Sequence, residues 1–169
     1  LHFFFFLLMW VGLALLLAYT VPFMLTHDFS QQGNFAIRVD KQLLGRFMDG
    51  VYWDEAGKWH FSNSYNYTWI WSSLTFSVTV MLGTLAGWII KREHNTAPYR
   101  VLYKLLVIGF IALFLGCLLH YQIPIIKRIW TSSMTLFAGG ICFLLMALFF
   151  YLIDVKKILR PFAWLKIYG

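Results

Sequence analysis

Long runs of apolar residues alternate along the chain with shorter polar segments. Four of these runs approach the roughly 20 residues that an α-helix needs to cross the hydrocarbon core of a bilayer. They cover residues 3–25, 69–90, 101–119 and 132–153, and a partial fifth run begins at Phe162. The pattern predicts an all-α polytopic membrane protein with about four complete transmembrane helices plus the start of a fifth.

The polar segment between the first two runs, residues 26–68, contains two patterned elements of its own. Residues 34–50 read NFAIRVDKQLLGRFMDG, and at about 100° per residue their apolar side chains form one broad arc. This pattern predicts an amphipathic helix with Asn34 as its N-cap and Gly50 just past its end. Residues 51–61, VYWDEAGKWHF, predict a short β-hairpin that turns at DEAG.

One acidic residue interrupts the apolar arc. Asp40 falls near the middle of the arc, where an ionisable group is costly unless it has a partner. The structural interpretation is an ion pair with Arg38, Lys41 or Lys127, and the functional interpretation is a place in a binding site. The sequence leaves both open.

Composition and charge agree with a membrane location. The chain is 60% hydrophobic and only 12% charged, whereas a soluble domain carries about 25% charged residues. Its net charge of +7 depends largely on basic residues in the short connections 91–100 and 154–161. The positive-inside rule predicts that these connections are cytoplasmic and that loop 26–68 is extracytoplasmic. We expect an integral protein of a bacterial inner membrane, with lipid as a partner. Nucleic acid is not expected as a partner, since the chain has no contiguous soluble basic face.

Few residues suggest familiar catalytic chemistry. The sequence has no P-loop, dinucleotide fingerprint, H-E-x-x-H or Cys/His metal spacing, so no metal is predicted. The small residues at Gly83 and Gly87, and at positions 138–140, predict close approach of helix backbones.

Polar residues crowd at the start of the fourth run. The segment 125–135, IIKRIWTSSMT, contains two cations, a tryptophan and four hydroxyl groups. Three interpretations compete: a helix cap at Thr131 or Ser132, an interface anchor made by the cations and Trp130, or an anion site at a helix N-terminus. From the physical arguments alone, the anchor is favoured.

Three segments occur in an order that resembles the heparan-α-glucosaminide N-acetyltransferase family, including its bacterial members. They read GNFAIRVDKQLLG, LTFSVTVMLGTLAGWIIK and IPIIKRIWTSSMTLFAGGICFLLMALFFYLIDVKK. The resemblance covers residues 33–169, and its most specific part is K-x-x-W-T-S-S from Lys127 to Ser133. It implies that residues 1–169 belong to one transmembrane acyltransferase domain, which moves an acetyl group from cytosolic acetyl-CoA to an amino sugar or glycan on the extracytoplasmic side.

The resemblance also implies particular site residues and an acyl donor. Acetyl-CoA is the expected donor, and six residues are candidates for binding the substrate or the donor: Lys127, Trp130, Ser132, Ser133, Asn34 and Asp40. The transferring histidine of the family lies in a loop near its N-terminal spans, which no residue here matches. We therefore expect no catalytic residue in this chain, and we expect the chain to be an internal or C-terminal piece of a longer protein. A homodimer is one possible assembly.

Two departures from the family pattern lie on the predicted acceptor side. Ile126 stands where the family commonly has Asn, and NYTWIW, residues 66–71, stands where it has an acidic D-P-E-G segment. Both bear on the choice of acceptor. Two other classes of function fit the composition. One is a transporter or flippase whose aromatic outer loop guides a lipid-linked sugar, and the other is a membrane scaffold subunit.

Overall fold

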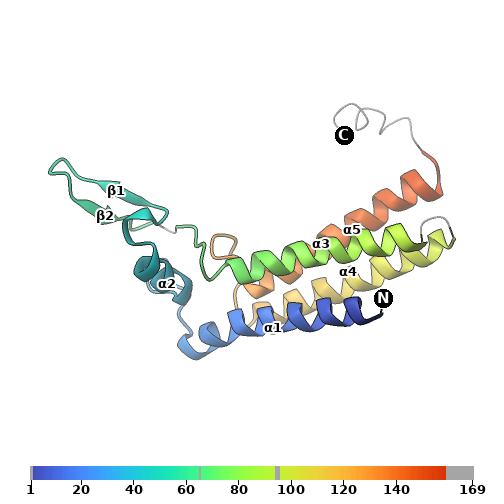
Figure 1. Ribbon diagram of the computed structural model, residues 1–169, viewed down its shortest axis with the longest axis horizontal. Helices are drawn as coiled ribbons and strands as arrows, with labels where there is room; N and C mark the ends of the chain where they lie inside the picture. Colours follow the sequence, from blue (N-terminus) through green and yellow to red (C-terminus); the bar gives the residue numbers. More distant parts are fainter. Residues whose placement is uncertain (1, 65, 94–95, 159–169) are drawn as a thin grey trace.

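A computed structural model gives the fold of residues 2–64, 66–93 and 96–158 (Figure 1). The expected fifth span, from residue 162, lies outside these described residues. Four long helices run antiparallel to their neighbours in chain order, and each is long and apolar enough to cross a membrane. They are α1 (His2–Thr26), α3 (Ser73–Glu93), α4 (Pro98–His120) and α5 (Ser132–Phe150), which continues into the π-helix η2 (Tyr151–Val155). The four long apolar helices of the prediction are confirmed.

The position predicted for the start of the second span was wrong. The helix begins at Ser73 rather than at Trp69, and it continues to Glu93. The backbone N–H groups of Trp69 and Ile70 donate to the carboxylate of Asp40, at 2.6 and 3.1 Å. Residues 69–72 therefore form a turn that leads into α3 while remaining tied to the preceding loop.

The closest packing in the bundle is between α4 and α5, where glycines let the two backbones approach. A Cβ added to Gly140 would lie 2.5 Å from the backbone nitrogen of Leu113, and one added to Gly116 would lie 2.6 Å from that of Phe137. The predicted close approach at positions 138–140 is confirmed, and it depends on the absence of a side chain at these positions.

The same prediction was wrong for α3. A Cβ added at Gly83 or at Gly87 would meet nothing within 4 Å. Both glycines are exposed on the bundle surface, because α3 packs on its neighbours through other positions such as Val78, Ala86 and Ile89. The small-residue spacing therefore predicted a helix–helix interface correctly in α5, where the backbone of α4 lies opposite, and wrongly in α3.

The two ends of the bundle differ in chemistry. At one end, α1 and α4 finish and α3 and α5 begin; we call this the polar end. At the other, the basic end, lie the last turn of α3 with Lys91 and Arg92, the start of α4, and η2 followed by Lys156. The two basic connections therefore share one end of the bundle, as the charge pattern requires. Which side of the membrane that end faces remains a prediction.

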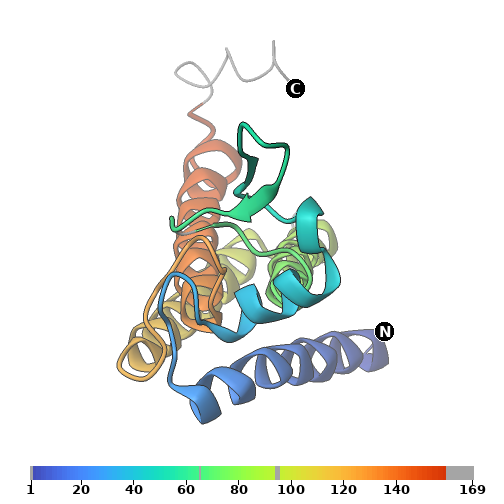
Figure 2. The same ribbon diagram turned by 90° about the vertical axis from the view of Figure 1, so that its left-hand side faces the viewer.

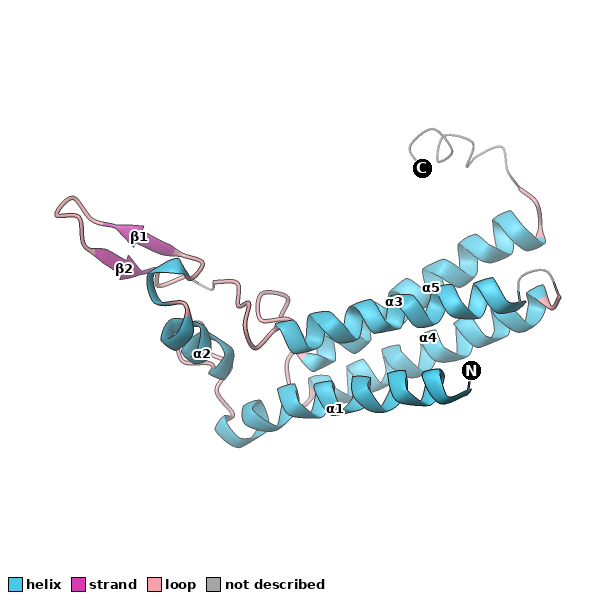
Figure 3. Cartoon of the chain, in the orientation of Figure 1, coloured by secondary structure: helices cyan, strands magenta, loops and turns pink. Residues whose placement is uncertain are grey.

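The remaining elements lie beyond the polar end, as Figures 2 and 3 show. Helix α2 (Phe35–Leu43) begins at Asn34, whose side chain accepts the N–H of Ile37 and so confirms the predicted N-cap. It stops seven residues before Gly50, because Gly45 takes a left-handed φ of 52°. The 3₁₀ turn η1 (Gly45–Phe47) follows.

Early termination of α2 changes which apolar residues are covered. Leu43 and Phe47 belong to the predicted apolar arc, but they are 67% and 77% exposed.

Strands β1 (Val51–Trp53) and β2 (Trp59–Phe61) then pair antiparallel, with Tyr52 opposite His60. The predicted hairpin is confirmed, and Gly57 supplies the positive φ of its turn, 74°.

Candidate functional site

The candidate site is a loop at the polar end that closes on itself directly before α5. The N–H of Ile126 donates to Thr131 Oγ1 at 3.2 Å, and the N–H of Thr131 donates to the carbonyl of Ile126 at 3.3 Å. We call residues 126–131 the closed loop. The Thr131 hydroxyl also donates to the carbonyl of Pro124 at 2.9 Å and caps α5 by accepting the N–H of Met134. The single donor and both acceptor positions of the Thr131 hydroxyl are therefore in use.

The two serines after Thr131 are also occupied within the chain. Ser133 Oγ lies 3.2 Å from the carbonyl of Pro124 and 3.1 Å from Thr131 Oγ1. Ser132 Oγ shares a hydrogen bond of 2.6 Å with Thr20 Oγ1 of α1. Both serines are buried. Capping, loop closure and attachment of α1 therefore account for these hydroxyls, and a ligand would have to replace one of the existing bonds.

Trp130 is held in a conformation that bulky residues rarely adopt. Its φ is 49°, in the left-handed region, which costs on the order of 1–3 kcal/mol and persists only when the surroundings enforce it. The indole Nε1–H donates to Thr79 Oγ1 of α3 at 3.1 Å, and the ring packs against Phe76 at a centroid distance of 5.3 Å. These contacts fix the Trp130 ring against α3.

Three parts of the chain fasten the closed loop from outside. The carbonyl of Ile129 accepts the Tyr19 hydroxyl of α1 at 2.6 Å and the Ser72 hydroxyl at 2.8 Å. The carbonyl of Arg128 accepts the N–H of Thr68 at 3.3 Å. The loop is therefore the place where α1, the start of α3 and the start of α5 are tied together.

Two cations remain on the outer surface of this rigid loop. Lys127 and Arg128 are both exposed, and the Arg128 guanidinium lies 5.5 Å from the centre of the Tyr67 ring. Four of the six candidate residues, Lys127, Trp130 and the two serines, thus come from one loop and the helix turn that follows it. Of these four, Lys127 presents the exposed charge.

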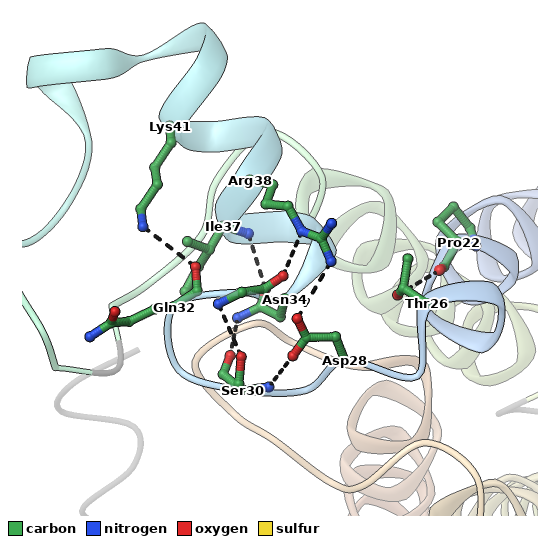
Figure 4. A network of polar contacts seen from close by, with 10 residues as sticks. Pro22, Thr26, Asp28, Ser30, Gln32, Asn34, Ile37, Arg38 and Lys41 are labelled. Atoms are coloured by element: carbon green, nitrogen blue, oxygen red, sulfur yellow. Dashed lines mark hydrogen bonds and ion pairs between the residues drawn. The ribbon is translucent and has the colours of Figure 1, made fainter.

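Asn34 and Asp40 belong to α2 and not to the closed loop. Asn34 is buried, accepts the N–H of Ile37 at 3.0 Å and donates from Nδ2 to the carbonyl of Ser30 at 2.8 Å (Figure 4). Its amide therefore has a partner at both ends. The role that the geometry supports for Asn34 is to start α2 and fix the preceding loop.

The ion pairs predicted for Asp40 were wrong. Arg38 donates to the carbonyl of Gly33 at 2.6 Å and approaches Asp28, and Lys41 donates to the carbonyl of Gln32 (Figure 4). Both cations are therefore bound to the 28–33 loop.

Asp40 instead binds backbone N–H groups. Its side chain is buried and accepts from Trp69 and Ile70, so it joins α2 to the turn before α3. Burial raises the pKa of the Asp40 carboxyl above its ordinary value of 3.8, and the two N–H bonds act in the opposite direction.

Sequence reasoning missed three residues that organise this end. Tyr19, Thr20 and Thr79 each bind the closed loop or the first residue of α5. A signal was present for the first two: adjacent hydroxyl groups within an apolar run need partners, because a bilayer provides none. The sequence could not say that these partners lie more than 100 residues away, at Ile129 and Ser132.

The described residues contain no group of three or more His, Cys, Asp or Glu side chains that could hold a metal ion. Two histidines have partners in the loops: His60 with Asp54 at 2.8 Å, and His120, whose Nδ1 accepts the N–H of Ile125 at 3.1 Å. Comparison of the chain with protein-family models, with curated proteins and with solved structures finds no match.

Proposed function

We propose that the chain forms the acceptor side of a transmembrane acyltransferase. In this proposal the polar end faces the extracytoplasmic side, acetyl-CoA is the donor from the cytosol, and an amino sugar or glycan is the acceptor. The observation that supports it most is the closed loop. The segment on which the family resemblance depends most, Lys127 to Ser133, is also one of the most constrained in the fold, with Trp130 held at a φ of 49°. Strain of this kind concentrates at functional sites.

The chemistry requires a base that takes a proton from the acceptor amine and donors that stabilise the oxyanion formed on the thioester carbonyl. The resemblance assigns the transferring group to a histidine that this chain does not match, so no catalytic residue is proposed here. Lys127 is the proposed ligand contact, because it is exposed and carried on a fixed loop. Trp130 is a positioning residue. Ser132 and Ser133 support the same loop from within.

An acetyl-transfer assay on membranes containing the protein as its cell makes it tests this proposal. Labelled acetyl-CoA is supplied with a glucosamine-terminated acceptor, and the rate is compared among wild type, Lys127→Ala and Trp130→Ala. We expect each substitution to lower kcat/KM by about tenfold or more, corresponding to at least ~1.4 kcal/mol of transition-state stabilisation. The fall should occur without loss of membrane insertion.

Lys58→Ala is the matched control, since Lys58 is an exposed cation on the hairpin turn far along the chain from the closed loop. It should transfer at the wild-type rate. Wild-type rates in both Lys127→Ala and Trp130→Ala would overturn the assignment of the loop. Absence of transfer by the wild-type protein would overturn the proposed activity and favour a non-catalytic transporter, flippase or scaffold.

A further inference from the structure

An apolar slot lies between α1 and α4, with α3 and one residue of α5 forming its floor. Its volume is about 400 Å³, and every residue that lines it is apolar. The lining residues lie within residues 8–16 of α1, 78–85 of α3 and 108–115 of α4, together with Leu136 of α5.

The slot is elongated along the helices. On α1 the lining positions recur once per turn from Leu8 to Leu16, and on α4 they recur from Ile108 to Leu115. At 1.5 Å per residue, this gives a length of about 12 Å. Since these helices are long and apolar enough to span the bilayer, the slot runs along the membrane normal at the depth of the hydrocarbon core.

An empty slot of this size would be unfavourable. Its walls would lose dispersion contacts, and the cost of a cavity rises with its volume. Water is a poor occupant, because it needs two to four polar partners and the lining supplies none. The occupant must therefore be apolar.

A lipid acyl chain has the properties that the slot requires. It is apolar, like every residue of the lining, and in a bilayer it runs along the membrane normal, as the slot does at the depth of the hydrocarbon core.

The slot is also continuous with the lipid-facing surface. The residues along its edges, Met9, Leu13 and Ile111, are 55%, 46% and 54% exposed, like the other large apolar residues that face outward from α1 and α4. At the polar end the hydrogen bond between Thr20 and Ser132 joins α1 to α5 one turn beyond Leu16 and Leu136. A chain therefore enters laterally, from the bilayer between α1 and α4.

We propose that this slot binds one acyl chain of a membrane lipid. The proposal does not depend on the transfer chemistry. The test is native mass spectrometry of the full chain, released from detergent after delipidation and incubation with palmitoyl-oleoyl phosphatidylglycerol. We expect one retained lipid per protein. Ala112→Phe and Gly12→Leu fill the slot from opposite walls and should each reduce retention at least fivefold.

Gly87→Leu is the control, because a side chain added at Gly87 meets nothing within 4 Å and points away from the slot. It should retain lipid like wild type. The proposal is overturned if the delipidated wild-type protein retains no lipid, or if Gly87→Leu loses lipid as completely as the filling variants. It is also overturned if the protein is a dimer whose lipid content does not change on filling, since a second copy would then cover the slot.

Two further ligands identify the part of the lipid that is recognised, and both use the wild-type protein, so they do not depend on the folding of any variant. Palmitic acid should compete with the retained phospholipid, because both carry the same chain. Glycerol phosphate, which has the headgroup chemistry without the chain, should not compete. Competition by glycerol phosphate alone would overturn the proposal in favour of a headgroup site.

Discussion

Helices α4 and α5 are held together differently from α1 and the rest of the bundle. The α4–α5 pair packs backbone to backbone through Gly116 and Gly140 along its length. In contrast, α1 packs mainly on α3, is fastened at the polar end by hydrogen bonds from Tyr19 and Thr20, and leaves the apolar slot open toward α4. In lipid there is no hydrophobic drive between helices. The comparison teaches that small residues give a continuous interface between α4 and α5, whereas α1, held by α3 and by hydrogen bonds at the polar end, leaves its side toward α4 available to lipid.

The largest expected effect is on the α4–α5 interface. Gly140→Leu would place a Cβ 2.5 Å from the backbone nitrogen of Leu113, and a helix backbone cannot move away as a side chain can. We expect a loss of about 3 kcal/mol or more in the free energy of unfolding, at the upper end of overpacking effects. Thermal unfolding in detergent, followed by circular dichroism, measures it. Gly87→Leu adds the same side chain on open surface and should unfold like wild type; equal losses in the two variants would contradict the packing difference.

The next effect concerns the attachment of α2 to the start of α3. Asp40→Leu leaves the N–H groups of Trp69 and Ile70 without the acceptor that they have now. Both bonds are partly buried, so each group should cost an amount near the low end of the range of about 1–3 kcal/mol for an unsatisfied polar group, and we expect a loss of about 2 kcal/mol. Arg38→Leu on the same helix is the control, because its exposed ion pair with Asp28 contributes about 1 kcal/mol or less. A larger loss for Arg38→Leu would show that the exposed pair holds α2.

A smaller effect is expected where α1 is fastened. Tyr19→Phe removes the donor to the carbonyl of Ile129, which keeps its second donor, Ser72. The expected loss is about 1 kcal/mol, typical of one hydrogen bond. The same unfolding measurement detects it, and hydrogen exchange in α1 should rise more than exchange in α5. A uniform rise across both helices would contradict the idea that α1 is a separately attached element.

The smallest expected effect is the contribution of Asp40 to the pH dependence of stability. Because its pKa is raised above 3.8, the folded protein binds this proton more tightly than the unfolded chain, and protonation favours folding. This contribution is fully present below pH 3.8 and is lost as the pH rises through the folded pKa. The stability of wild type relative to Asp40→Asn should therefore fall on raising the pH from below 3.8 toward neutrality. A rise in this difference over the same range would mean that the Trp69 and Ile70 bonds outweigh burial.

Local patterns predicted the elements of this fold, and distant partners decided the details. The apolar runs located four helices within a few residues, Asn34 identified one cap, and the glycine of DEAG identified the hairpin turn. The second cap was predicted at Thr131 or Ser132, and it is Thr131. Each of these depends on neighbours in sequence. The end of α2 was predicted at Gly50 because the apolar arc continues past Gly45, yet the backbone at Gly45 is already left-handed.

The partners of the polar residues could not be obtained in the same way. Nothing local distinguishes Gly83 from Gly140, since the difference is whether another backbone lies opposite. For Asp40, nearby cations were the obvious partners, but the backbone N–H groups that it binds are 29 and 30 residues further along the chain. Lys127, Trp130 and the two serines could be predicted to lie together because they are neighbours in the sequence. The roles of Tyr19 and Thr79 could be recognised only from the fold.

The bond between Tyr19 and Ile129 also sets an order in time, because 110 residues separate its two partners. A ribosome that adds about 5–20 residues per second needs roughly 5–20 s to cover that distance. Of the four helices, α1 can pack on α3 as soon as α3 is made, but its Tyr19 hydroxyl has no final acceptor until the loop before α5 follows. The polar end is therefore completed later than the α1–α3 contact.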